Sequence, residues 1–244
     1  SSFKLNKDVF GFPIQWIPKN PRWQNYVDIW TQIPLLTFVK NTVKITVVVT
    51  PVAAVHFLLC SLRLCQDAVQ GKNALFLGYI ATIAVPWQAY MVPQFMMMSS
   101  WHLNNTHLAI MCLQAFSAFG VFLMKQFSEG IPGEMLEAAR IDGASEARIF
   151  FTIVLRLLAP AMVTIFLFLF VATWNNFLLP LMMVSSDTLK PVTLGLYGMV
   201  SLSTFTDRGA LMMGALLGVL PVIVLFLGLQ RYWQSGLAAG AVKG

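Results

Sequence analysis

The stretch ALFLGYIATIAVPWQAYMVPQFMMM, residues 74–98, does not contain a single charged side chain. A helix of about 20 apolar residues crosses the roughly 30 Å hydrocarbon core of a bilayer, so this stretch is long enough to span a membrane. Four other stretches meet the same standard: 45–62, 108–124, 160–185 and 209–230. A charge at the centre of a span costs about 2.5–3.5 kcal/mol on insertion scales, which makes their near absence informative. The sequence therefore predicts an all-α, polytopic membrane bundle with five visible transmembrane helices.

The composition of the whole chain supports this prediction. Of the 244 residues, 57% are hydrophobic and 11% are charged, and the mean hydropathy is +0.71. Soluble domains contain about 25% charged residues, and a soluble fold of this size could not hide so much apolar surface. Composition thus excludes a soluble enzyme, a disordered tail and a disulfide-rich secreted module. The net charge of +6 comes from scattered Lys and Arg, which is typical of cations that flank membrane helices rather than of a nucleic-acid-binding surface.

The same cations predict the orientation. With residues 1–44 set aside, the links at 63–73 and 125–159 and the C-terminal tail hold eight Lys and Arg, whereas the links on the other side hold two. Since cytoplasmic loops are enriched in Lys and Arg, we expect the loop at 125–159 and the C-terminus to be cytoplasmic. Residues 1–40 are expected to form an external or interfacial segment, and residues 41–244 the transmembrane domain.

Within the cytoplasmic loop, residues 131–151 predict a short helix, a break and a second helix. Pro132 suits the start of the first helix, and Glu134 suits the positive end of its dipole. Gly143 can end this helix in the left-handed conformation, and Ser145 can cap the next one. Glu137 and Arg140 are spaced to pair at i, i+3. The expected apolar stripe consists of Met135, Leu136, Ala139 and Ile141.

From these residues alone, the amphipathic knob has two interpretations. It can dock into a partner protein, with Ala138 and Ala139 allowing close backbone approach, or it can lie on the membrane or pack under the bundle.

The loop also resembles the signature loop of the permease subunits of binding-protein-dependent ABC importers. That family pattern reads E-A-A, three residues, G, nine residues, I, one residue, L and then P. The stretch EAARIDGASEARIFFTIVL, residues 137–155, matches it at Glu137, Ala138, Ala139, Gly143, Ile153 and Leu155. Arg156 stands where the family has proline. Three further stretches resemble the carbohydrate, maltose-type branch: FLMKQFSEGIPGEMLEAARIDGAS (122–145), TWNNFLLPL (173–181) and QRYWQSGLAAGAVKG (230–244).

The resemblance implies a type I importer permease that translocates a carbohydrate delivered by an extracytoplasmic binding protein. The loop would be a coupling helix that docks on a separate ATPase subunit and links ATPase closure to alternating access. The implied coupling residues are Glu137, Ala138, Ala139, Arg140, Asp142 and Gly143. Because family members have six helices, the first one is expected to be absent from this chain, either because the sequence is truncated or because the protein works with five.

The implied partners are a dimer of ATPase subunits, a second and non-identical permease subunit, the binding protein and membrane lipid, but no nucleic acid. The implied location is the cytoplasmic (inner) membrane of a bacterium or archaeon. The chain contains no G-x-x-x-x-G-K-[ST] phosphate loop, so ATP and Mg are expected to bind the partner ATPase. We therefore expect no catalytic residue, metal or cofactor in this chain.

Trp174, Asn175 and Asn176 are candidate substrate contacts, since amides inside the fourth span can face a polar cavity that receives sugar hydroxyls. The alternative is that they hydrogen-bond between helices. For the whole chain, the other functions considered are an importer permease for a non-sugar solute and an ion-coupled secondary transporter. The latter class usually needs intramembrane carboxylates, and the five stretches contain neither Asp nor Glu.

Overall fold

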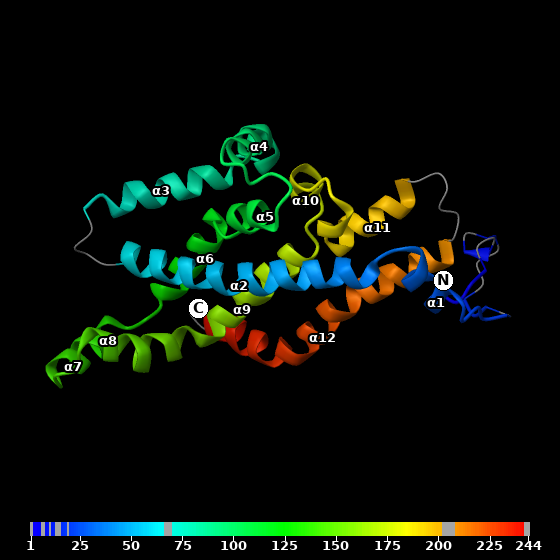
Figure 1. Cartoon of the computed structure of the whole chain (residues 1–244). Coiled ribbons are helices and arrows are strands. Elements are labelled where there is room, and N and C mark those ends of the chain that lie inside the picture. The colour runs from blue at the N-terminus through cyan, green and yellow to red at the C-terminus, as the bar shows by residue number, and fades with distance from the viewer. Residues whose placement is uncertain are drawn as a thin grey trace. The chain divides into compact units, whose positions relative to one another are not determined.

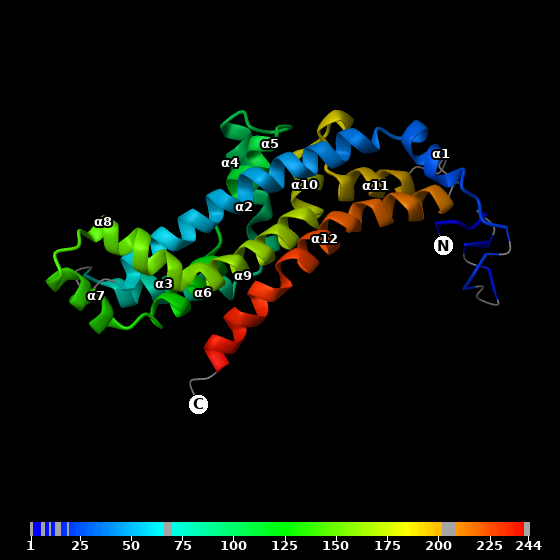
Figure 2. The same cartoon turned by 90° about the horizontal axis from the view of Figure 1, so that it is seen from below.

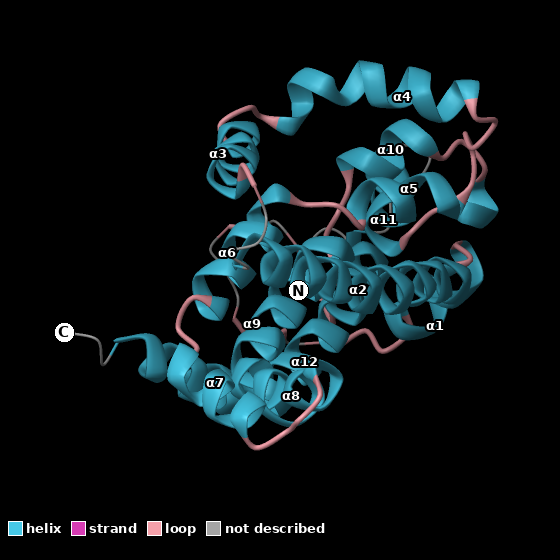
Figure 3. Ribbon diagram, turned by 90° about the vertical axis from the view of Figure 1, so that its left-hand side faces the viewer, coloured by secondary structure: helices cyan, strands magenta, loops and turns pink. Residues whose placement is uncertain are grey.

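A computed structural model describes residues 2–5, 8–9, 11–12, 16–18, 20–65, 70–201 and 208–241. Helices and loops make up this described part, and no strand is found in it (Figure 3). Parts of the expected external segment 1–40 and of the link before residue 208 fall outside the described residues. In chain order the elements are α1 (Asn25–Gln32), α2 (Leu35–Cys65), α3 (Lys72–Ile83), η2 (Trp87–Tyr90), α4 (Met91–Ser100), α5 (His107–Gln114), α6 (Ala118–Ser128), α7 (Gly133–Ile141), α8 (Glu146–Ile149), η3 (Phe150–Val154), α9 (Leu155–Trp174), α10 (Leu178–Met183), η4 (Asp187–Leu189), α11 (Val192–Ser201) and α12 (Arg208–Ala241).

Four helical runs in the described residues are long and apolar enough to cross a membrane, namely Leu35–Leu62, His107–Ser128, Glu146–Trp174 and Arg208–Gln230. A fifth is obtained when α3 and the run Trp87–Ser100 are counted together, although they are bent by 93°. The all-helical membrane prediction is confirmed, with five spans as the upper count.

The uncharged stretch 74–98 forms two helical runs with a break between them, rather than one continuous helix. Proline lacks an N–H and its ring clashes with the preceding helical turn, and Pro86 adopts an extended backbone at φ −62° and ψ 131° directly after α3. The last turn of α3 tightens, because the amides of Ala84 and Val85 bond to the carbonyls of Ala81 and Thr82. These bonds satisfy backbone groups that the break would otherwise leave unpaired.

The fourth span also differs from the expected range 160–185. Its helix begins at Glu146, runs through α8, the π-helical turn η3 and α9, and ends at Trp174 (Figure 2). Asn175 and Asn176 follow in a break before α10 rather than lying inside the span. The Asn176 side-chain oxygen accepts a hydrogen bond from the amide of Leu179 at 3.3 Å, which satisfies an amide of the first turn of α10.

The chain divides into two compact units. Unit 1 comprises residues 1–47, 95–111 and 172–225. Its core brings α1 and the start of α2 together with α11 and the start of α12, through Ile29, Leu35, Phe38, Val192, Met199, Ala210 and Met213. Side chains from α2 and α5 fix the segment around η4: the Asn41 amide donates to the carbonyls of Thr188 and Lys190, and the His107 ring contacts the carbonyl of Leu189 at 2.9 Å.

Unit 2 comprises residues 48–94, 112–171 and 226–244. Its core contains Ala53, Phe57, Leu58, Leu64, Val121, Met124, Ile149, Val154, Leu158 and Ile165, drawn from α2, α6, α8, η3 and α9. Helix α3 packs along α6, and the rings of Phe76 and Phe122 stack at 6.0 Å between centroids. Gly120 allows α6 to approach Phe57, because a Cβ at this glycine would lie 2.1 Å from the Phe57 ring.

Candidate coupling site

Residues 131–151 form the predicted helix, break and helix, all within unit 2 (Figure 1). Pro132 is the N-cap of α7, and Glu134 lies in the first turn. Gly143 has φ +78°, as its expected left-handed conformation requires. Its amide bonds to the carbonyl of Arg140, and the amide of Ala144 bonds to that of Ala139. This pair of bonds is a Schellman motif, which ends a helix sharply and orients the chain that follows.

The second helix begins as predicted. The Ser145 hydroxyl accepts a hydrogen bond from the amide of Arg148 at 3.3 Å and so caps α8. This second helix does not end within residues 131–151, because α8 continues through η3 into α9. The break at Gly143 thus connects the short helix α7 to a helix that is long and apolar enough to cross the membrane.

Helix α7 has two different apolar faces. Leu136 and Ala139 pack against the core of unit 2, together with Ala144 from the break. Met135 and Ile141 are exposed, at 43% and 86%. The expected single stripe is therefore divided, because residues 136 and 139 turn inward while residues 135, 138 and 141 turn outward at the helical period. The outward face of α7 thus exposes two large apolar side chains, Met135 and Ile141, one on each side of Ala138 in the sequence.

Arg140 joins the two short helices. Its guanidinium donates to both carboxylate oxygens of Glu146, at 2.7 Å from Nε and 3.3 Å from Nη2. This hydrogen bond raises the pKa of Arg140 and lowers the pKa of Glu146. The expected partner Glu137 does not form the ion pair, although its charge also raises the pKa of Arg140. Asp142 is the exposed C-cap of α7.

A cavity of about 1120 Å³ separates part of this loop from the rest of unit 2. Leu136, Glu137 and Arg140 of α7 line one side of it, and Lys125 and Glu129 line another. Lys125 is buried, pairs with Glu129 and lies over the ring of Phe76, 4.1 Å from its centroid. The loop is thus attached through its core-packed residues while a space remains behind it.

The candidate substrate residues lie in unit 1, at the end of α9 and in the break after it. Trp174 is 2% exposed, and its indole N–H donates to the carbonyl of Gly218 on α12 at 2.8 Å. The carbonyl of Asn176 accepts a hydrogen bond from the Thr193 hydroxyl at 2.8 Å. The Trp174 side chain therefore bonds to another helix of unit 1, whereas Asn176 reaches α11 through its backbone carbonyl and uses its side chain locally. Their contact with a substrate stays a prediction.

Comparison with known proteins identifies the family. Residues 24–238 match the family of binding-protein-dependent transport system inner membrane components. The chain belongs to this family. It is therefore an inner-membrane permease component of a binding-protein-dependent transporter, as the loop at 137–155 indicated.

Several permeases of known systems are similar along most of their length. The arabinooligosaccharides transport permease AraQ of Halalkalibacterium halodurans is 29% identical, over 100% of this chain and 88% of that protein. The lactose transport permease LacG of Rhizobium radiobacter is 31% identical over 91% of this chain and 80% of that protein. The melibiose/raffinose/stachyose import permease MelC of Bacillus subtilis is 31% identical over 94% of this chain and 84% of that protein.

A solved structure has the same fold. A chain of a bacterial ABC transporter involved in the import of the acidic polysaccharide alginate superposes with a TM-score of 0.81. The match covers 95% of this chain and 87% of that chain, at 22% sequence identity.

This permease departs from its family pattern at Arg156, and the structure shows what replaces the proline. Arg156 lies inside α9, where the helix continues without interruption, and Pro160 lies inside the same helix. The Thr164 hydroxyl donates to the carbonyl of Pro160 at 3.0 Å. The irregularity in this region is the π-helical turn η3, just before Arg156.

Sequence reasoning missed two features of this permease: the Arg140–Glu146 pair and the exposure of Ile141. The pair joins residues six positions apart across the break, a spacing that no single helix brings together. Among the described residues, no group of three His, Cys, Asp or Glu is placed to hold a metal ion.

Proposed function

We propose that this permease carries a carbohydrate, delivered by an extracytoplasmic binding protein, and that residues 131–151 couple it to a separate ATPase subunit. The cargo class is supported by the relatives, whose names specify arabinooligosaccharides, lactose and melibiose, raffinose or stachyose. A non-sugar cargo and ion coupling have no comparable support.

The observation that carries the coupling role is the division of α7 into two apolar faces. One face anchors the helix to the core of unit 2 through Leu136 and Ala139, and the other presents Met135, Ala138 and Ile141 outward. A helix that merely packed under the bundle would need only the inner face. The outer face fits a groove on a partner, with Ala138 allowing close approach and Ile141 supplying an apolar contact.

Coupling also requires a connection that transmits movement from α7 to the membrane helix. The Schellman motif at Gly143 and the Arg140–Glu146 pair fix α7 against α8, and α8 continues into the membrane helix α9. A displacement of α7 by closure of the ATPase dimer would then move α9. The ATPase can shift the equilibrium between the inward-open and outward-open states only by as much free energy as its interactions with the two states differ.

In this proposal the loop and the C-terminus are cytoplasmic, ATP and Mg bind the ATPase dimer, and a second, non-identical permease subunit completes the pathway. Glu137 and Asp142 provide polar contacts with the ATPase. The count of Lys and Arg on alternate links supports the orientation.

Crosslinking with a matched pair of variants tests the coupling role. Ala138→Cys places a thiol on the outer face of α7, and Ala139→Cys places one on its core-packed face. In membranes containing the native importer, a short bifunctional thiol reagent is expected to join Ala138→Cys to an ATPase subunit carrying single cysteines along its groove. Ala139→Cys is expected to give little product. Equal crosslinking at both positions, or none at residue 138, would overturn the assignment.

A further inference from the structure

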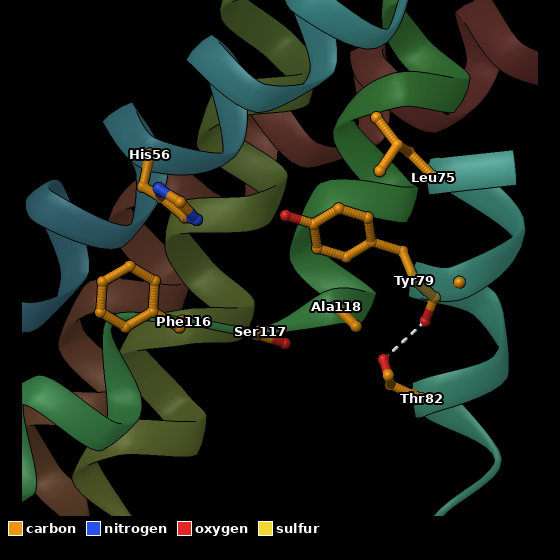
Figure 4. A pocket seen from close by; sticks show the side chains of 8 residues that line it. His56, Leu75, Tyr79, Thr82, Phe116, Ser117 and Ala118 are labelled. Atoms are coloured by element: carbon orange, nitrogen blue, oxygen red, sulfur yellow. Dashed lines mark hydrogen bonds between the residues drawn. The ribbon is translucent and has the colours of Figure 1, made fainter. Parts of the chain in front are cut away.

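A second cavity, distinct from the coupling loop, opens among three membrane-spanning segments of unit 2. It has a volume of about 620 Å³ and is lined by His56 of α2, by Tyr79 and Thr82 of α3, and by Phe116 and Ser117 between α5 and α6 (Figure 4). Volumes of about 300–1,000 Å³ are usual for sites that bind small molecules.

The cavity lies at a break in a span. The run His107–Ser128 is long and apolar enough to cross the membrane, but its helix is interrupted at residues 115–117, near the middle. Such an interruption leaves carbonyls of α5 and amides of α6 without partners in their own helix, and the Ser117 hydroxyl accepts a hydrogen bond from only one of them, the amide of Gly120. Non-helical backbone at membrane depth is tolerated where it is buried in protein or lines a polar cavity.

The side chains around this break combine polar groups with aromatic surfaces. The His56 ring packs edge-on against the Phe116 ring, with centroids 4.8 Å apart and planes at 79°. The Tyr79 hydroxyl points across the open space toward His56 (Figure 4). The Thr82 hydroxyl donates to the carbonyl of Tyr79 at 2.7 Å, so it is used within α3. An imidazole, a phenol and a serine hydroxyl thus surround one space together with an aromatic ring.

We infer that this cavity is a saccharide-contact site of the permease. A sugar ring has an apolar C–H face that can lie on an aromatic ring, and hydroxyl groups that can exchange hydrogen bonds with His56, Tyr79 and Ser117. A phospholipid acyl chain matches only the apolar part of the lining and offers no hydrogen-bond partner to His56, Tyr79 or Ser117. The inference rests on the proposed carbohydrate cargo, and it places a contact in this chain at residues other than Trp174, Asn175 and Asn176.

The first measurement is chemical protection of Ser117→Cys. Cys65 and Cys112 are replaced by alanine. Cys60, whose sulfur lies 3.7 Å from His56 Nε2, is replaced by serine, which keeps a polar group beside the cavity. The purified importer is then tested for uptake of lactose, melibiose, raffinose and an arabino-oligosaccharide. A charged, membrane-impermeant thiol reagent is then expected to label Ser117→Cys, and the transported sugar is expected to slow this labelling at least threefold. Ser100→Cys, exposed at the end of α4, is the control that the sugar leaves unprotected.

The second measurement removes one hydroxyl. Tyr79→Phe is expected to raise the sugar concentration that half-protects Ser117→Cys by about five- to tenfold, the usual consequence of losing one hydrogen bond. Tyr90→Phe, on η2 and outside the cavity lining, is expected to leave it unchanged.

The outcomes separate this inference from the proposed function. If no sugar of the panel is taken up, the carbohydrate proposal itself fails. If a sugar is taken up but does not protect Ser117→Cys, the permease function stands and this site is rejected. Labelling by an apolar maleimide but not by the charged reagent would assign the cavity to lipid and would also overturn the inference.

Discussion

Gly143→Val tests the break in the coupling loop, and the chain offers a close control for it. Gly143 and Gly71 have nearly the same left-handed backbone, at φ +78° and +74°, and a Cβ at either position would meet nothing within 4 Å. A substitution therefore creates the same backbone strain at both sites without a steric clash. The two glycines differ in location: Gly143 ends α7, whereas Gly71 precedes α3.

The expected magnitude follows from the backbone. A residue other than glycine in the left-handed conformation costs about 1–2 kcal/mol, so the native conformation of the loop should lose a factor of about 5–30 relative to its alternatives. Because α7 is joined to α8 through the Schellman bonds at Gly143 and Ala144, this loss should loosen the connection to α9. We expect Gly143→Val to insert normally but to lower the sugar transported per ATP hydrolysed at least fivefold. Gly143→Asn should have a milder effect, since asparagine tolerates this conformation better.

The assay is paired measurement of ATP hydrolysis and sugar uptake by the reconstituted importer. Gly71→Val should lose a similar amount of stability but keep the wild-type ratio of sugar transported to ATP hydrolysed. A wild-type ratio in Gly143→Val would show that the break does not transmit movement. An equal loss in Gly71→Val would show that the effect comes from general destabilisation, and either result would refute the reasoning.

Two further predictions concern packing and charge in unit 2. Gly120→Ala should lower the thermal unfolding temperature in detergent, because its Cβ would lie 2.1 Å from the fully buried ring of Phe57 and overpacking of this kind costs about 1–3 kcal/mol. Gly228→Ala is the control, because its Cβ would meet nothing within 4 Å and it should not lower the unfolding temperature. An equal decrease in unfolding temperature in both variants would contradict the packing argument. The hydrogen bond from Arg140 lowers the pKa of Glu146. The pair should therefore stabilise the α7–α8 connection fully at pH values above the ordinary pKa of a glutamate. This stabilisation should be lost as the pH falls through the lowered pKa of Glu146. Carboxyl-carbon NMR should show a higher Glu146 pKa in Arg140→Gln, and an unchanged value would exclude this cause.

The parts of the structure that the sequence predicted well depend on local chemistry. Gly143 and Ser145 specify a helix end and a helix start through their own backbone and side-chain bonds, so the helix, break and helix could be predicted from a few residues. The apolar stretches likewise predicted the membrane helices, because length and lack of charge are sufficient for that prediction.

The parts that the sequence did not predict depend on geometry between elements. Hydropathy cannot distinguish a straight span from one bent at Pro86, because both have the same composition. It also misplaced the start of the fourth span, since Arg148 and Arg156 reduce the hydropathy of a segment that is still helical. The inner and outer faces of α7 could not be separated in advance, because their apolar residues adjoin in the sequence and only the packed core shows which ones it contacts.

The attachment of the coupling loop determines which membrane helices respond to it. Leu136 and Ala139 contact the same core cluster that contains Phe57 of α2 and Leu158 of α9, so force on α7 reaches both helices and not only the one that follows it in sequence. The cavity of about 1120 Å³ is lined by Leu136, Glu137 and Arg140 of α7, and in the proposed coupling role it would give α7 space to tilt. A loop packed tightly on all sides could not move without breaking its core, and one with no core contact would move without effect. If residues 131–151 couple the permease to an ATPase as proposed, coupling requires both the inner anchor and the space beside it. Filling that space with larger side chains should then block transport while leaving the anchor intact.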